Sequence, residues 1–264
     1  MCTVIVHVPQ RTDEPLRLLA VRDEDPARPW DALGPWWPET YPGVVGVRDI
    51  RANGAWLAAD PATGRLAVML NRADVETLPD DGLRSRGGLV LDSVAGRSPG
   101  DHPRTHGFNL VEVEGRQVRV VSWDGSALRT TELAPGTHMI AHDDVDDEAT
   151  PRIARWLAPF TQAHAALATD AAAPAVADLD DGPGAAGEAA GEAPGDWFGP
   201  WLALLEASAD LPATDDEAII RDNRPHGYPT LSLLVCTATI GPGGVELAYG
   251  AFDEPGAWNA PHLA

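Results

Sequence analysis

Short apolar and β-branched runs joined by tight turn sequences dominate this chain and restrict it to a sheet-rich fold. Asn53-Gly54 and Glu114-Gly115 are typical hairpin turns, and residues 60–64 favour a further turn. Runs bounded by such turns are expected to pair as antiparallel strands. The strands predicted in this way are residues 2–8, 16–21, 45–51, 55–59, 65–70, 107–113, 117–123, 128–133, 137–141, 230–239 and 245–251.

Two segments carry the apolar spacing of helices instead. Residues 151–168 place large apolar side chains three to four positions apart, and residues 197–207 resume that pattern. Between them, residues 169–196 are mostly small and acidic, which predicts a flexible low-complexity insert. We therefore predict a single α+β domain, residues 1–264, that contains this insert.

The charge balance excludes several classes of partner. The formal net charge is −21, from 19 cations and 40 carboxylates, and such a surface repels phosphate backbones and anionic membranes. All 19 cations are arginine, which excludes P-loop, Schiff-base and pyridoxal phosphate chemistry because each needs a lysine amine. A small-molecule ligand or substrate is expected rather than nucleic acid, and the oligomeric state stays open.

Cysteine content and hydropathy favour a cytoplasmic location. Cys2 and Cys236 are the two cysteines, which is too few for a framework of several disulfides. The first 15 residues lack the basic and apolar regions of a signal peptide. The apolar runs are far shorter than the ~18 residues that a membrane-spanning helix needs, so no membrane insertion is expected.

Cys2 is the first candidate for chemistry. Removal of Met1, which aminopeptidases perform before small residues, would leave a chain that begins with a thiol and a free α-amine. The amine titrates near ~7.7–8.0 and the thiol near ~8.5, so one residue would supply both a nucleophile and a weak base. The plainer alternative is a small residue that enters a buried strand.

A series of short motifs, strongest in the first 110 residues, resembles one known family. The motifs are Met1-Cys2, Val21-Arg22-Asp23-Glu24, Ala27-Arg28-Pro29, Gly54-Ala55-Trp56-Leu57, Leu70-Asn71, Arg86-Gly87 and Gly107-Phe108-Asn109-Leu110. In this order they resemble the NRDE family, also called the transport and Golgi organization 2 family, from Cys2 to about residue 252. The resemblance implies an N-terminal nucleophile hydrolase-like fold, a four-layer αββα sandwich of two antiparallel sheets.

The pattern is also similar to that of choloylglycine hydrolases and penicillin V acylases, which begin Met-Cys-Thr as this chain does. The resemblance implies that Cys2 is the nucleophile and that Arg22 favours its thiolate. It implies that Asp23 holds the α-amine and that Asn71 donates a hydrogen bond to a developing oxyanion.

Three positions depart from that pattern. Val21 stands in place of the family asparagine, and His142 stands near a later asparagine of the acylases, where it could donate a hydrogen bond to a ligand. Pro229 stands near the place of a late arginine, for which Arg224 is a loose substitute. An ion pair of Arg22 and Asp23 that ties the strand to the core remains the structural alternative to catalysis.

Two functions of different classes therefore remain. The first is a cysteine N-terminal nucleophile amidohydrolase that acts on a small amide and needs no cofactor. The second is a non-catalytic carrier of haem, an acyl lipid or acyl-CoA in the same cleft. The residues expected to bind the ligand are Trp36, Trp37, Trp56, Asn109 and His142. No metal site is predicted, because His102 and His106 are separated by Pro103 and no HExxH motif occurs.

A geometric expectation follows from the hydrolase interpretation. Cys2, Arg22, Asp23 and Asn71 should meet at one end of adjacent strands and open into a cleft. The side chains of neighbouring residues in a regular strand point to opposite faces of the sheet. Arg22 and Asp23 therefore cannot both reach the thiol if the strand is regular there. We therefore expect a bulge or a strand end at that point.

Overall fold

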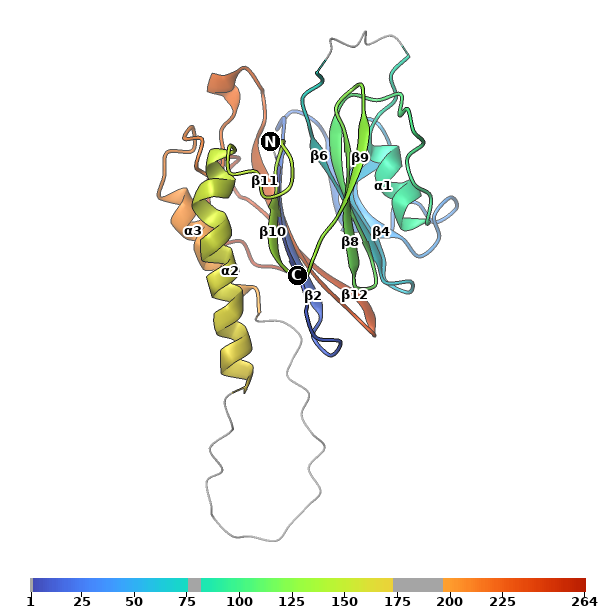
Figure 1. Cartoon of the computed structure of the whole chain (residues 1–264). Coiled ribbons are helices and arrows are strands. Elements are labelled where there is room, and N and C mark those ends of the chain that lie inside the picture. The colour runs from blue at the N-terminus through green and yellow to red at the C-terminus, as the bar shows by residue number, and fades with distance from the viewer. Residues whose placement is uncertain (1, 76–81, 173–196) are drawn as a thin grey trace, which may run out of the picture.

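Two antiparallel β-sheets face each other across a shared hydrophobic core (Figure 1). The computed structural model describes residues 2–75, 82–172 and 197–264. Helices pack on the outer face of each sheet, so the layers run helix, sheet, sheet, helix. The prediction of an α+β fold built on two antiparallel sheets is confirmed.

One sheet, sheet A, has five strands. In spatial order they are β10 (Gly136–Ile140), β1 (Thr3–Val8), β2 (Leu16–Glu24), β11 (Leu231–Gly241) and β12 (Gly244–Ala251). Both faces of β1 are covered, because Val4 and Val6 pack toward the other sheet while Ile5 packs toward the helices. A strand buried on both faces needs an apolar residue at nearly every position, which explains the continuous apolar run at residues 2–8.

The other sheet, sheet B, has seven strands that lie in chain order. They are β3 (Trp30–Gly34), β4 (Val45–Asp49), β5 (Gly54–Asp60), β6 (Arg65–Asn71), β7 (Phe108–Glu114), β8 (Gln117–Trp123) and β9 (Leu128–Glu132). The alternation of side chains decides which core each residue joins: Leu66, Val68 and Leu70 of β6 face sheet A, whereas Ala67 and Met69 face the helix outside.

The helices divide between the two outer faces. Helices α2 (Pro151–Ala172) and α3 (Gly199–Ala209) cover sheet A, where Phe160 and Trp201 pack edge to face with ring centroids 5.6 Å apart. Helix α1 (Gly87–Val94) covers sheet B, and a short 3₁₀ helix, η1 (Arg224–His226), precedes β11. Among the described helices, none is both long and apolar enough to cross a membrane.

Strand β3 and helix α1 were not predicted from the sequence. Strand β3 forms in a stretch rich in Pro and Trp. Helix α1 has only eight residues, and a close approach of two glycines positions it against β5. A Cβ added to Gly54 would lie 2.6 Å from the carbonyl carbon of Gly87, so this contact requires glycine.

The predicted insert at residues 169–196 has a different beginning from the one expected. Residues 169–172 continue α2, which ends at Ala172. The rest of the predicted insert, residues 173–196, lies outside the described residues.

Candidate active site

The first residue of the described chain and two strand ends meet at one end of the sandwich. Cys2 directly precedes β1, and the pairing of Thr3 with Val21 places it beside the end of β2. Asn71 is the last residue of β6 in the facing sheet. The side chains of Cys2, Arg22, Asp23 and Asn71 all line one cavity of about 280 Å³.

An irregular strand pairing occurs beside Arg22 and Asp23, close to the end of β2. Asp23 pairs with Ser232 of β11 while Arg22 pairs with Leu234, so Leu233 is an extra residue in β11. This is a β-bulge, which bends the ladder locally and redirects side chains. The expected irregularity is therefore present, and it lies in the partner strand rather than in β2 itself.

Cys2 is almost completely buried, and its sulfur lies against the backbone of Asp23. The Asp23 amide donates to Sγ over 3.3 Å, and the thiol is 3.6 Å from the Asp23 carbonyl oxygen. Burial raises the pKa of the Cys2 thiol, and the Asp23 carboxylate adds to that rise while Arg22 opposes it. The thiol is therefore neutral at rest, and a nucleophilic reaction needs a base to remove its proton.

The Asp23 carboxylate is held by a buried hydrogen-bond network. The Ser232 hydroxyl donates to Oδ1 over 2.6 Å, and the Asn223 amide donates to Oδ2 over 3.2 Å. The Ser232 oxygen in turn accepts from the Arg221 backbone amide, and the Arg221 guanidinium donates to Asn223 Oδ1 over 3.0 Å. This network fixes the orientation of the carboxylate beside the N-terminal end of β1.

Buried arginines surround this carboxylate. Arg221 donates both to the carbonyl and to the carboxylate of Asp216. Arg152, in the first turn of α2, donates to the Thr3 hydroxyl over 3.1 Å. Burial and the nearby Arg221 lower the pKa of Arg152 to about 10, so it remains charged at neutral pH, and Asp23 partly offsets the shift.

Arg224, the loose substitute for a late arginine of the hydrolases, and nearby Arg221 differ in their surroundings. Arg224 is exposed, and its ion pair with Asp222 has an N···O distance of 2.6 Å. Arg221, three residues earlier, is buried and linked to Asp23 through Asn223. Arg221, Asn223 and Ser232 were missed because their polar side chains stand near the start of a strand, with no spacing that marks them as a set.

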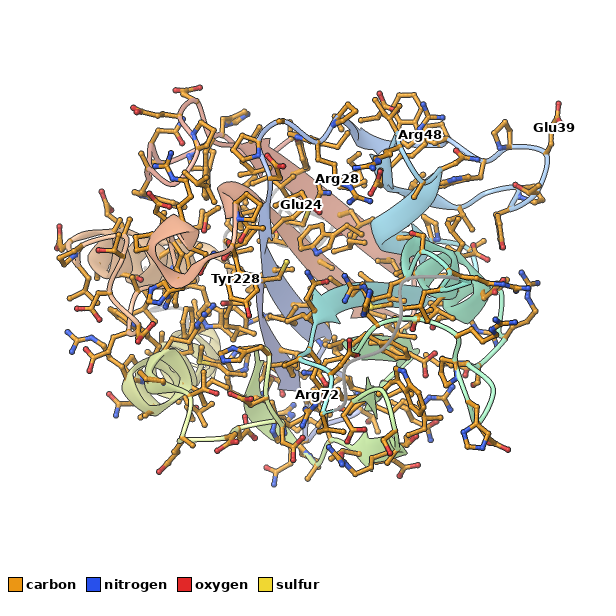
Figure 2. All side chains as sticks on the ribbon, turned by 90° about the horizontal axis from the view of Figure 1, so that it is seen from above. Glu24, Arg28, Glu39, Arg48, Arg72 and Tyr228 are labelled. Atoms are coloured by element: carbon orange, nitrogen blue, oxygen red, sulfur yellow. The ribbon has the colours of Figure 1, made fainter. Side chains whose placement is uncertain are left out.

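The cavity concentrates positive charge in an otherwise acidic protein. Four arginines and three carboxylates line it; the arginines are Arg22, Arg28, Arg84 and Arg86, and the carboxylates are Asp23, Glu24 and Asp49. Figure 2, which views the molecule from above, shows Glu24 and Arg28 near each other at this end of β2; their closest N···O distance is 3.9 Å. Arg28 also forms an ion pair with Asp49, with an N···O distance of 2.5 Å.

Two buried donors of the cavity wall lack a partner among the described residues. They are Nη1 of Arg22 and Nε1 of Trp56, whose residues are 2% and 7% exposed. A buried N–H group without an acceptor carries a desolvation cost. Because both residues line the cavity, a ligand with acceptor atoms would remove that cost.

His106 is a further residue of the cavity that the sequence analysis did not assign to this site. Its Nδ1 lies 2.6 Å from the Asp74 carboxylate, whose other oxygen accepts from the Gly107 backbone amide over 2.6 Å. A carboxylate on one ring nitrogen orients the imidazole and favours the proton on that nitrogen. In the sequence, His106 was considered only together with His102 as a metal ligand, and not with the motif that begins at Gly107.

Of the three predicted ligand-binding tryptophans, Trp56 lines the cavity. Trp37 instead packs into the core between sheet B and α1, and its indole donates to the Asn53 carbonyl over 3.0 Å. Trp36 is half-buried near Arg48, whose guanidinium carbon lies 5.1 Å from the centre of the ring, and its indole donates to the Ala32 carbonyl. A role for these two residues in ligand binding remains a prediction.

Asn109 and His142 are also placed away from the cavity wall. The Asn109 side chain links β7 to the segment after β10, because its amide donates to the carbonyls of Ala141 and Asp143 and its oxygen accepts from Ser122. His142 is half-buried, with Nε2 3.2 Å from the Asp143 carboxylate. Burial and nearby Arg152 lower the pKa of His142, so the ring is mostly neutral at neutral pH.

These features define a two-sheet α+β protein with a buried cysteine in a polar cavity at the end of its central strands. The family described as Transport and Golgi organisation 2 matches residues 1–179, and the chain belongs to that family. A comparison with curated proteins gives no match.

Proposed function

We propose that the protein is a cysteine amidohydrolase of the N-terminal nucleophile type, which cleaves a small polar amide through an acyl-enzyme at Cys2. The observation that carries the proposal is the convergence of Cys2, Arg22, Asp23 and Asn71 on one cavity. They come from two sheets and three separate parts of the chain. Such a convergence of a nucleophile with charged and amide side chains is what acyl transfer requires.

In the proposed reaction, Met1 has been removed and the α-amine of Cys2 is the base. The amine takes the thiol proton, and the sulfur attacks the carbonyl carbon of the substrate. The Asn71 amide donates to the oxyanion that forms, and Asp23 holds the resulting ammonium. Collapse breaks the C–N bond, the ammonium protonates the leaving amine, and water then hydrolyses the thioester with the same amine as base.

The cavity wall favours a polar substrate over an unsubstituted acyl chain. Four arginines line it, and the unpartnered N–H groups of Arg22 and Trp56 call for acceptor atoms. An amide whose acyl or amine part carries a carboxylate matches both features, because a carboxylate offers two acceptor oxygens and one negative charge.

The mature protein is expected to begin at Cys2, because only then is the α-amine free to act as the base. Intact-mass spectrometry of protein purified without an N-terminal tag measures this directly. The chain has no lysine, so its α-amine is the single primary amine. A mature chain should therefore react with an aldehyde to form a thiazolidine from the thiol and the amine, with loss of one water. Retention of Met1 in active protein would contradict the mechanism.

Replacing Trp56 with Phe should weaken substrate binding while the ring packing is largely kept. The change removes the unpartnered indole N–H, and a hydrogen bond to a charged acceptor corresponds to a ~10-fold rise in KM. Trp258→Phe is the matched control, since it also removes an indole N–H without a partner among the described residues, but outside the cavity. Steady-state kinetics should show an unchanged KM for Trp258→Phe; an equal effect of both changes would argue against substrate binding at Trp56.

A further inference from the structure

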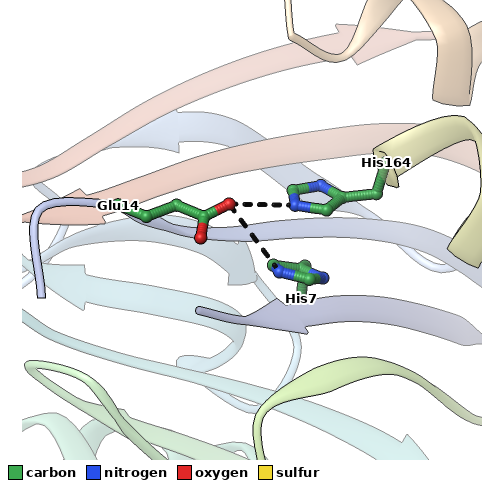
Figure 3. Close-up of side chains that lie close together, drawn as sticks. All are labelled: His7, Glu14 and His164. Atoms are coloured by element: carbon green, nitrogen blue, oxygen red, sulfur yellow. Dashed lines mark hydrogen bonds and ion pairs between the residues drawn. The ribbon is translucent and has the colours of Figure 1, made fainter. Parts of the chain in front are cut away.

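A second cluster of polar side chains lies in sheet A, apart from the cysteine. His7 belongs to β1, Glu14 to the turn between β1 and β2, and His164 to α2. Figure 3 shows the two imidazoles and the carboxylate converging on one point. Cys2 precedes β1 and His7 is near its end, so the two clusters are about 16 Å apart along the strand.

The separations of the three groups suit a metal ion. Glu14 Oε1 lies 3.2 Å from His164 Nε2 and 3.9 Å from His7 Nε2, and the ligating atoms all lie within 4.8 Å of one another. Ligands at ~2.0–2.1 Å from a tetrahedral ion are about 3.3 Å apart. The distances between the ligand atoms are therefore of the order that a tetrahedral site needs, whereas the orientation of the rings has to change.

The surroundings orient the His7 ring for metal binding. The Nδ1 of His7 lies 2.9 Å from the Thr137 hydroxyl. If Nδ1 donates a hydrogen bond to that oxygen, the Nε2 lone pair is left to bind a metal ion. Metal-binding histidines usually donate such a hydrogen bond from their other ring nitrogen.

The cluster can also adjust to an ion. The two rings stack with centroids 3.4 Å apart and planes at 21°, whereas a shared ion must lie close to the plane of each ring. The rings must therefore open on binding. His164 Nδ1 has no hydrogen-bond partner among the described residues, so turning this ring breaks no hydrogen bond at that nitrogen. Glu14 is held in place from its backbone, because its carbonyl accepts from Arg116 over 3.1 Å.

We propose that His7, Glu14 and His164 form a zinc-binding site with water as the fourth ligand. Two imidazoles and one carboxylate are a ligand set that zinc accepts, with one coordination position left open. The three residues also line a cavity of about 390 Å³, which provides room for that water. Bound zinc would connect α2 to the β1–β2 turn. The site is independent of the proposed hydrolase, so either can fail alone.

The test uses untagged full-length protein, freed of metal by a chelator and then titrated with Zn²⁺ alone. Calorimetry should show one ion per chain, and elemental analysis after gel filtration should recover it. Glu14→Gln and His164→Phe each remove one ligand, and Phe keeps an aromatic ring in the stack. Each variant should bind at least ~100-fold more weakly, since even the partners of metal ligands cost 10–100-fold. His102→Ala, at an exposed position, is the control and should bind like the wild type.

A melting curve with and without Zn²⁺ provides the second measurement. Zinc should raise the melting temperature of the wild type and of His102→Ala, but not that of the two ligand variants. Glu14 lies in a surface turn, so Glu14→Gln should fold even if His164→Phe does not. The proposal is overturned if the wild type takes up no stoichiometric zinc, or if Glu14→Gln binds it as tightly as the wild type.

Discussion

The Cys2→Ala variant is expected to lose amide hydrolysis by at least ~10³-fold, because it lacks the sulfur that forms the acyl-enzyme in the proposed reaction. An activated ester such as p-nitrophenyl acetate tests this before the natural substrate is known. The wild type should release a burst of nitrophenolate and carry an acetyl group on Cys2, which peptide mass spectrometry locates. The variant should show neither signal.

Cys236→Ala is the matched control for this experiment. Cys236 is also buried in the core between the sheets, and burial raises its pKa to about 12, so it is unreactive. Each alanine change should cost only about 1 kcal/mol of stability, because it removes one buried sulfur atom. If Cys2→Ala acylates or turns over like Cys236→Ala, the hydrolase is excluded. Ligand binding that survives in such a protein would favour the carrier of haem or an acyl lipid.

The largest effect on stability is expected for Asp23→Ala. The change removes an acceptor from Ser232 and Asn223 and takes away one of the negative charges near buried Arg152. Removal of one partner of a buried charged network costs about 3–5 kcal/mol of the free energy of unfolding. Urea denaturation followed by circular dichroism measures this loss as a lower midpoint.

Asp13→Ala serves as the control for Asp23→Ala. Asp13 also contacts an arginine, Arg11, but both side chains are exposed, at 66% and 75%. An exposed ion pair is screened by water, so the midpoint should hardly move. If Asp23→Ala were as mild as Asp13→Ala, the buried network would not depend on the carboxylate, and the role of Asp23 as an anchor would have to be abandoned.

Local sequence signals predicted most of the sheets. Residues 117–123 were predicted as a strand with the bounds that β8 has, and the other predicted strands differ at their ends by a few residues. The hairpin turns are short, so each strand is specified by residues within it and next to it. Strand β3 and helix α1 were not predicted. For α1 the reason is that the helix is short and that its position depends on the contact between Gly54 and Gly87.

The candidate site could be predicted in part. The family resemblance singled out Cys2, Arg22, Asp23 and Asn71, which the fold brings to one cavity. The groups that hold Asp23 lie some 200 residues further along the chain, at Asn223 and Ser232, and only tertiary structure brings them close. The same holds for His7 and His164, which stack although no sequence spacing relates them.

The arginines of the cavity have a consequence for the pH–rate profile of the proposed hydrolase. A guanidinium keeps its proton throughout the range used in enzyme assays, so the positive charge near Cys2 does not change with pH. Lysines in the same places would have added titrations of their own on the alkaline side. Above the range in which carboxylates titrate, a change of rate with pH therefore reports the Cys2 thiol and the α-amine rather than the charge of these arginines.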